Sequence, residues 1–215
     1  MSAELLKISS ENPDPAALRY AAAFIRRGEL VAIPTDTFYG IAADPFNLAA
    51  ADQIYRVKGR PETRALPILV NTASQAIALT RDVPYTFHKL AAKFWPGPLT
   101  LLVEASTGVP LKVTAHTGNV ALRVPNAKIP LAVVTAAAIP ITATSANLSG
   151  AAECTSAEQV HDQLHGRINI IVDGGTSPRD VASTIVDLSD ENARWRIIRE
   201  GAIPADEISK FFAQG

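Results

Sequence analysis

The stretch PTDTFYG, residues 34–40, directly follows an apolar, strand-like run from Leu30 to Ile33. Proline ends the pairing of a strand because it lacks a backbone donor, and glycine permits backbone angles that other residues resist. The stretch therefore predicts a polar turn at a strand end, with the hydroxyl groups of Thr35 and Thr37 available for binding. An ordinary turn has a similar composition, so the functional interpretation depends on the rest of the chain.

The composition is typical of a globular domain of moderate size. The chain has 215 residues, of which 47% are hydrophobic, and its 20 basic and 21 acidic residues give a net charge of −1. This length supports one substantial core, so we expect residues 1–215 to form a single globular domain. The balanced charge lacks the strongly basic character of proteins that cover nucleic acid, so any phosphate site must be a local cluster.

Cysteine content and hydropathy predict a soluble, cytoplasmic protein. The single cysteine, Cys154, excludes an internal disulfide framework and a multi-cysteine zinc site. Residues 1–15 lack the basic and apolar regions of a signal peptide. The longest apolar stretch, residues 129–143, contains two prolines and is shorter than the roughly 20 residues that a membrane helix needs. We therefore expect no membrane association.

Strand-like and helix-like segments alternate along almost the whole chain. The expected strands are residues 5–8, 29–33, 66–70, 99–103, 120–124, 141–144, 168–172, 183–187 and 194–199. The expected helices are residues 13–27, a helix capped by Asn47 and ending at Gly59, 72–79, 84–94, 129–138, a helix to residue 164 with a capping box of Thr155 and Glu158, and 204–212. The alternation predicts an α/β fold with an open, twisted, mixed or largely parallel sheet and flanking helices.

Three cations lie within seven residues where a predicted helix ends at Gly59. Lys58, Arg60 and Arg64 are close enough in sequence to converge on one polyanion. The helix dipole favours basic residues at a C-terminus, which accounts for Lys58 at an exposed helix end. The dipole accounts poorly for Arg60 and Arg64, which lie beyond the glycine in a turn marked by Pro61. We interpret these cations as a candidate anion-binding cluster.

Further polar residues occur at the ends of other predicted strands. They are Arg123, the turn SANLSG at residues 145–150, the loop 173–178, Ser183 and Arg199. Small hydroxyl and amide residues before a glycine are typical of turns that bind anions, and also of ordinary loops. The chain has neither a P-loop signature nor a dinucleotide fingerprint, so a nucleotide would have to be held by side-chain cations and hydroxyl-bearing turns.

Taken together, these segments resemble the YrdC-like family of threonylcarbamoyl-AMP synthases. Matching segments follow the family order: PTDTFYGI from residue 34, KGRP from 58 with Arg64, FWPGPLTLLV from 94, ALRVP from 121, TSANLSG from 144, STIVD from 183 and IREGAI from 198. Phe38 and Ile41 are conservative departures, and the segment after Leu66 lacks a histidine that some relatives carry there. The chain ends soon after the Arg199 motif and so resembles the short, single-domain form.

The resemblance implies a reaction in which L-threonine, bicarbonate and ATP, with Mg²⁺, give threonylcarbamoyl-adenylate and pyrophosphate. This is the first step of the threonylcarbamoyladenosine modification of tRNA beside the anticodon. Partner proteins would transfer the group to tRNA, and the chain itself would contact tRNA weakly or transiently.

The resemblance also implies roles for individual residues. It assigns threonine binding to Thr35, Arg60, Arg123 and Ser183, ATP binding to Lys58, Arg64, Ser145, Asn147 and Arg199, and catalysis to Lys58 and Arg60. It implies no metal site built from protein side chains alone. The sequence leaves open how Lys58, Arg60 and Arg64 divide their work.

Other functions fit parts of the sequence less well. An RNA-binding protein of the same family, acting in tRNA or rRNA maturation without adenylation, would need a stronger basic surface and exposed aromatic residues. A hydrogenase-maturation carbamoyltransferase would add an acylphosphatase-like region and cysteine-paired zinc fingers, for which one cysteine is too few. A purely structural interaction domain would leave polar residues at five strand ends unexplained.

Overall fold

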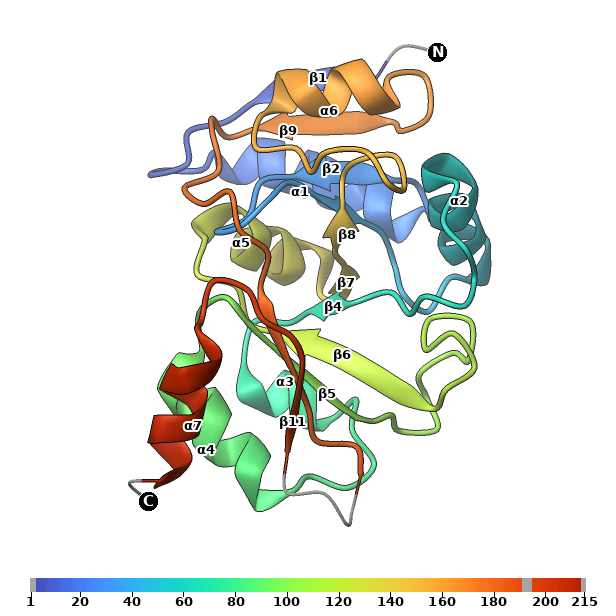
Figure 1. Cartoon of the computed structure of the whole chain (residues 1–215). Helices are drawn as coiled ribbons and strands as arrows, with labels where there is room; N and C mark the ends of the chain where they lie inside the picture. The colour runs from blue at the N-terminus through green and yellow to red at the C-terminus, as the bar shows by residue number, and fades with distance from the viewer. Residues whose placement is uncertain (1–2, 191–194, 214–215) are drawn as a thin grey trace.

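Two β-sheets form the centre of this computed structural model, which describes residues 3–190 and 195–213 (Figure 1). The five-stranded sheet has the order β1 (Glu4–Lys7), β9 (Ile170–Asp173), β2 (Val31–Ile33), β3 (Gly40–Ala42) and β8 (Thr144–Ser145). The six-stranded sheet has the order β11 (Arg196–Arg199), β10 (Thr184–Asp187), β5 (Leu99–Glu104), β6 (Asn119–Arg123), β4 (Ile68–Leu69) and β7 (Ile141–Thr142). The predicted strand 194–199 begins at Arg194, which lies outside the described residues.

Both sheets are mixed. In the five-stranded sheet β1, β9 and β2 are parallel, whereas β2, β3 and β8 are antiparallel. In the six-stranded sheet β10 is parallel to β5 and β4 is parallel to β6, and the other neighbours are antiparallel. The predicted α/β class with a mixed sheet is therefore confirmed, and its strands are divided between two sheets. The expectation of a single domain stays a prediction.

Two segments differ from the sequence prediction. Gly40, expected in a turn, begins β3, which pairs with β2 as a hairpin. The segment 141–144, expected as one strand, is divided because β7 pairs with β4 and β8 pairs with β3. The change of sheet occurs at Ala143, whose backbone N–H donates to the backbone oxygen of Pro67. The chain therefore passes from one sheet to the other within four residues.

The described residues form seven helices, close to the predicted positions. They are α1 (Pro15–Arg26), α2 (Leu48–Lys58), α3 (Ala73–Ile77), α4 (Tyr85–Phe94), α5 (Lys128–Ala137), α6 (Ala157–Leu164) and α7 (Ala205–Ala213). In this part of the chain no helix combines the length and apolar character needed to cross a membrane.

Local capping explains where two helices begin and end. The side chain of Asn47 accepts hydrogen bonds from the N–H groups at the start of α2, and Gly59 ends this helix with a left-handed φ of 58°. Both predictions are confirmed. The predicted cap of α6 was wrong by one residue, because Ser156 rather than Thr155 accepts from the N–H of Gln159.

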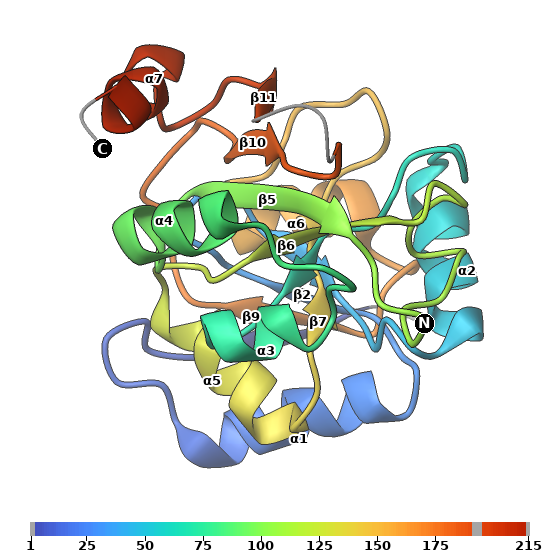
Figure 2. The same ribbon diagram turned by 90° about the horizontal axis from the view of Figure 1, so that it is seen from below.

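Helices cover the outer faces of the two sheets. Helices α1 and α5 lie side by side and pack on one face of the five-stranded sheet (Figure 2). A larger apolar cluster includes α2, α6, α3 and α4 and reaches both sheets, with Ile41 and Leu101 among its members. Along β5 and β6, residues that alternate with this apolar set, such as Thr100 and Arg123, line a cavity instead.

Candidate active site

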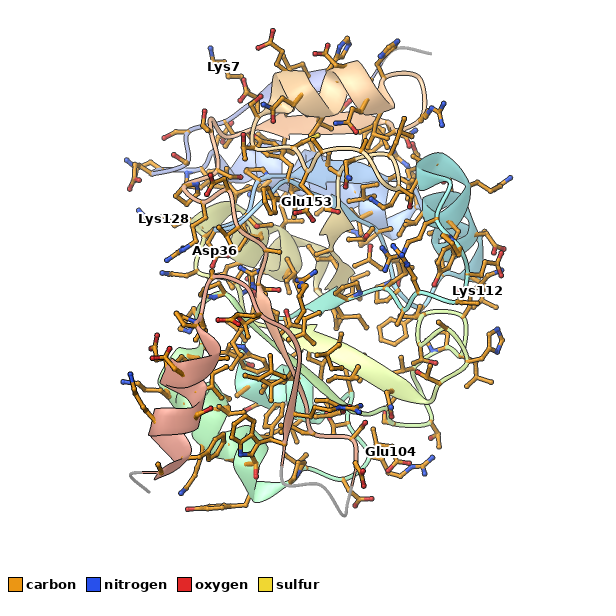
Figure 3. All side chains as sticks on the ribbon, in the orientation of Figure 1. Lys7, Asp36, Glu104, Lys112, Lys128 and Glu153 are labelled. Atoms are coloured by element: carbon orange, nitrogen blue, oxygen red, sulfur yellow. The ribbon has the colours of Figure 1, made fainter. Side chains whose placement is uncertain are left out.

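A cavity of about 530 Å³ lies between the two sheets. Its lining includes residues of β3 and β8 from one sheet and of β5, β6 and β10 from the other. Asp36, beside this lining, and Glu153, within it, are labelled in the central part of the molecule in Figure 3. The cavity brings together every site residue named from the sequence: Thr35, Lys58, Arg60, Arg64, Arg123, Ser145, Asn147, Ser183 and Arg199.

The register of the six-stranded sheet positions the floor of the cavity. Thr100 of β5 lies opposite Ile185 of β10, and Arg123 of β6 lies opposite Leu69 of β4. All four residues line the cavity, whereas Leu122 belongs to the apolar core. Because successive side chains of a strand point to opposite faces, the floor combines a cation and a hydroxyl group with aliphatic neighbours.

Lys58 is buried, with 2% of its surface exposed, so its predicted position at an exposed helix end was wrong. The turn that follows β8 packs against the end of α2. The Nζ atom of Lys58 donates to the backbone oxygens of Ser145 and Asn147 and to Oδ1 of Asn147. In return, the backbone N–H of Ser149 donates to the backbone oxygen of Lys58 over 2.8 Å. Lys58 therefore holds the 145–149 turn in place.

Burial changes the protonation of Lys58. Desolvation, followed by the nearby charge of Arg60, lowers the pKa of Lys58 from 10.5 to about 8. The ammonium form still predominates near pH 7, and its three N–H groups match the three oxygen acceptors.

Arg60 is held by its own loop. Its Nε donates to the backbone oxygen of Arg64 at 3.3 Å, NH2 donates to that of Ala65 at 2.9 Å, and NH1 donates to Oγ1 of Thr144 at 3.4 Å. The hydroxyl of Tyr55 lies 3.1 Å from the backbone oxygen of Arg64 and supports the same loop. A guanidinium has five N–H groups, so this loop orients Arg60 and leaves further donors for a ligand.

Arg199 of β11 is fixed to Ser183. Nε and NH2 of Arg199 donate to the backbone oxygen of Ser183 at 3.1 and 2.7 Å, and NH2 also donates to its Oγ at 3.1 Å. The Ser183 hydroxyl lies 2.8 Å from that of Thr100. A Cβ at Gly201 would lie 2.2 Å from the backbone oxygen of Ala182, so only glycine permits this close approach.

Arg123 connects the two sheets through its contacts with the PTDTFYG stretch, residues 34–40. Its NH2 lies 2.5 Å from Oδ1 of Asp36, its NH1 donates to Oγ1 of Thr37 at 3.1 Å, and its Nε donates to the backbone oxygen of Gly97 at 3.0 Å. Burial lowers the pKa of Arg123, and the charge of Asp36 opposes this change. The guanidinium is thus locked in one orientation beside the hydroxyl of Thr35, which lies 3.1 Å from that of Thr37.

The cavity is strongly positive. Its described lining contains Lys58, Arg60, Arg64, Arg123 and Arg199 but only one carboxylate, that of Glu153. Such a surface favours a polyanionic ligand over a neutral one. The predicted polar loop 173–178 does not line this cavity. It contacts the PTDTFYG stretch from outside the cavity, where the hydroxyl of Tyr39 donates to the backbone oxygen of Gly175 at 2.6 Å.

Sequence reasoning missed several residues of the site. Asp36 lies within the PTDTFYG stretch, next to the hydroxyl residues that were recognised, so its polar side chain was a usable signal. Thr100 stands inside an apolar strand and Glu153 stands in a loop without a motif, so neither offered a local signal. Their positions follow from tertiary packing alone.

A family profile described as "Telomere recombination", for Sua5, YciO and YrdC proteins, matches residues 23–201. The chain belongs to the Sua5/YciO/YrdC family. This membership confirms the resemblance found in the sequence.

Curated relatives of this family carry a common name. A Pyrococcus abyssi protein named threonylcarbamoyl-AMP synthase is 39% identical over 199 residues, which cover 92% of this chain and 57% of the relative. A Bacillus subtilis protein of the same name is 38% identical over 203 residues, covering 94% of this chain and 57% of the relative. The chain thus spans less than two thirds of each.

A solved structure of the family agrees with the fold. The crystal structure of P. abyssi Sua5 complexed with L-threonine has a TM-score of 0.92 and 37% sequence identity to this chain. The match covers 96% of this chain and 60% of that one.

Proposed function

We propose that this chain forms threonylcarbamoyl-AMP and pyrophosphate from L-threonine, bicarbonate and ATP. The observation that carries the proposal is the charge of the cavity between the two sheets, whose described lining contains five cations and a single carboxylate. A triphosphate and an amino-acid carboxylate are ligands that such a lining suits. The names of the relatives and the threonine complex of P. abyssi Sua5 support the same reaction.

The chemistry requires positioning and charge neutralisation. The amino nitrogen of L-threonine forms a bond to the carbon of bicarbonate, and water leaves. The resulting carbamate is already an anionic nucleophile. A carbamate oxygen attacks the α-phosphorus of ATP in line, the new P–O bond forms, and the bond to pyrophosphate breaks. No histidine occurs among the described lining residues, and the cations of the cavity would stabilise the charge that develops on the phosphate oxygens.

Two hydrogen-bonded clusters support a division of the cavity into two subsites. The first links Arg123 through Thr37 to Thr35, and we assign it to threonine together with Arg60 and Ser183. Arginine binds a carboxylate in a bidentate manner, which suits Arg123 and Arg60.

The second cluster links Lys58 to Ser145 and Asn147. We assign it to ATP, together with Arg64 and Arg199. Lys58 would act mainly through the turn that it holds. Because Arg199 binds Ser183, we place the reacting carbamate and α-phosphate near this pair.

Mg²⁺ would accompany ATP. Among the described residues there is no group of three or more His, Cys, Asp or Glu side chains that could hold a metal ion. This donor set fits an ion carried chiefly by phosphate oxygens, with Glu153 as the carboxylate of the lining that would contribute a ligand. The ion would supply further neutralisation of phosphate charge.

We also propose that partner proteins in the cytoplasm transfer the threonylcarbamoyl group to the tRNA adenosine beside the anticodon. Contact of this chain with tRNA would be weak, because its net charge is −1. The names of the relatives support a synthase rather than an RNA-binding protein without adenylation activity.

The test is direct detection of the product. Purified protein would be incubated with ATP, Mg²⁺, L-threonine and ¹³C-labelled bicarbonate, and the adenylate would be identified by mass spectrometry. The label should appear in the carbamoyl carbon of threonylcarbamoyl-AMP. A folded protein that binds ATP and threonine but forms only unlabelled threonyl-AMP, or ADP, would contradict the proposal.

A further inference from the structure

Two adjacent hydroxyl groups in the cavity wall have a fixed hydrogen-bond polarity. The side chains of Thr35 and Thr37 are 6% and 5% exposed, and their Oγ1 atoms lie 3.1 Å apart. Thr35 Oγ1 lies 2.7 Å from the backbone oxygen of Phe38. A carbonyl oxygen only accepts, so Thr35 uses its one hydroxyl proton in this bond.

The proton between the two threonines must therefore come from Thr37. Thr35 Oγ1 accepts that proton and also accepts from the backbone N–H of Thr37 at 3.0 Å. With one bond donated and two accepted, the Thr35 hydroxyl has no capacity left.

The hydroxyl of Thr37, unlike that of Thr35, can still accept a hydrogen bond. It donates to Thr35, and it accepts from NH1 of Arg123 at 3.1 Å. In the contacts among residues 3–190 and 195–213, one lone pair remains on Thr37 Oγ1 and no proton remains to donate. The group that Thr37 meets in a ligand must therefore be a hydrogen-bond donor.

We propose that Thr37 Oγ1 accepts a hydrogen bond from the amino nitrogen of the amino-acid substrate, so that Thr37 selects ligands of the threonine subsite that carry an α-amino group. This inference rests on the proposed function. The carboxylate is excluded as the partner of Thr37 because it only accepts, and it is expected on Arg123, which has N–H groups to spare. The amino nitrogen is bonded to the carbon that carries the carboxylate. A substrate whose carboxylate binds Arg123 therefore brings this nitrogen within reach of Thr37, which contacts NH1 of Arg123.

The same contact would persist in the reaction. When the amino group becomes a carbamate, its nitrogen keeps one N–H, which Thr37 can still accept. Holding this N–H and the carboxylate together would fix the rotation of the carbamate relative to the α-phosphate. Asp36 contributes indirectly, since it orients Arg123 through the bond between Oδ1 and NH2.

Two substitutions separate the oxygen from the shape of the side chain. Thr37→Val removes the acceptor with little change of volume, and Thr37→Ser retains it. Binding would be measured without ATP by ligand-observed NMR titration, using L-threonine, L-valine and 3-hydroxybutyrate, which lacks the amino group. The matched control is Thr80→Val, since Thr80 is 7% exposed, donates to the backbone oxygen of Ala76 and lies outside the cavity lining.

Thr37→Val should raise the Kd of L-threonine and of L-valine by a similar factor of roughly 10- to 150-fold, as expected for a hydrogen bond to a charged group. The Kd of 3-hydroxybutyrate should stay within about twofold, Thr37→Ser should restore most of the affinity, and Thr80→Val should change nothing.

Three results would overturn the inference. An equal loss for all three ligands would mean that Thr37 acts only through Arg123. A loss confined to L-threonine would place the substrate hydroxyl at Thr37, and no loss at all would remove Thr37 from the subsite. If the unsubstituted protein does not bind L-threonine, the proposed function fails first, and this inference fails with it.

Discussion

Asp36 and Arg123 form a buried ion pair between the two sheets, with 2.5 Å between Oδ1 and NH2 and side chains only 2% and 8% exposed. Asp36 follows β2 of one sheet, and Arg123 ends β6 of the other. The second carboxylate oxygen of Asp36 is buried and has no hydrogen-bond partner within the part of the chain that the structure describes, and Arg179 donates to the backbone oxygen of Asp36 at 3.2 Å. This pair therefore couples the contact between the sheets to the proposed threonine subsite.

Removing one partner of the pair should be costly because the other charge stays buried. We expect Asp36→Asn and Arg123→Met each to lower the free energy of unfolding by about 3 to 5 kcal/mol, and the double variant to lose less than the sum. Urea denaturation measures these values. The exposed pair of Arg81 and Glu104 is the control, and Glu104→Gln should change stability by less than about 1 kcal/mol. Strictly additive losses would show that the two charges are not coupled.

Lys58→Met should remove most adenylate formation. The variant deprives the backbone oxygens of Ser145 and Asn147 of their donor, so the turn that carries the ATP-binding side chains loses its anchor. We expect the KM for ATP to rise by about 10-fold or more, the effect of losing one charge-assisted hydrogen bond. Steady-state assays would measure it, with Lys128→Met as the control because Lys128 is exposed and lies outside the cavity lining. An unchanged KM for ATP would show that the turn stands without Lys58.

The lowered pKa of Lys58 predicts a specific dependence of stability on pH. Between about 8, the pKa in the folded protein, and 10.5, its ordinary value, the unfolded chain binds a proton that the folded protein does not. Stability rises with pH wherever the unfolded state binds more protons. Relative to Lys58→Met, the protein should therefore gain up to about 3 kcal/mol of unfolding free energy across this range and show no difference in slope below it. Urea titrations from pH 6 to 10 test this, and parallel curves would contradict it.

Local signals explain which parts of the fold could be predicted. Asn47 and Gly59 mark the ends of α2 because a cap depends on one side chain and a few neighbouring backbone groups. The division of residues 141–144 between two sheets could not be predicted, since the segment has the pattern of one strand and its pairing partners lie far away in sequence.

The site residues likewise could be predicted from local sequence signals but not where their positions depend on distant parts of the chain. Its cations and hydroxyl residues were recognisable because they cluster at the end of α2 and recur at the ends of several strands, although each cluster alone has the composition of an ordinary turn. The burial of Lys58 was missed, since the turn that covers it lies about 90 residues further along the chain. Thr100 was missed because an apolar strand conceals a single inward-facing hydroxyl.

Arg60→Lys should be far from neutral. The guanidinium uses Nε, NH1 and NH2 on its own loop and on Thr144, which fixes its orientation in a way that an ammonium cannot reproduce. Losing one charge-assisted hydrogen bond should reduce kcat/KM by roughly 10- to 150-fold. The control is Arg81→Lys, at an exposed side chain outside the cavity lining. A loss below about threefold would mean that Arg60 acts only as a diffuse charge.

Pyrophosphate release should require ATP, bicarbonate and L-threonine together, because the carbamate forms from the last two and only then attacks phosphorus. Omitting any one substrate should stop it. Serine lacks the β-methyl group and should be poorer by roughly 10- to 200-fold, the range that one methyl group in an apolar pocket delivers. Valine keeps the branched shape but leaves the partner of the threonine hydroxyl without a hydrogen bond, so it should be rejected at least as strongly. A coupled pyrophosphate assay measures these rates. Release that ignores bicarbonate, or that is equal for serine and valine, would indicate ordinary amino-acid adenylation or nonspecific ATP hydrolysis, and the fold assignment would stand without the proposed reaction.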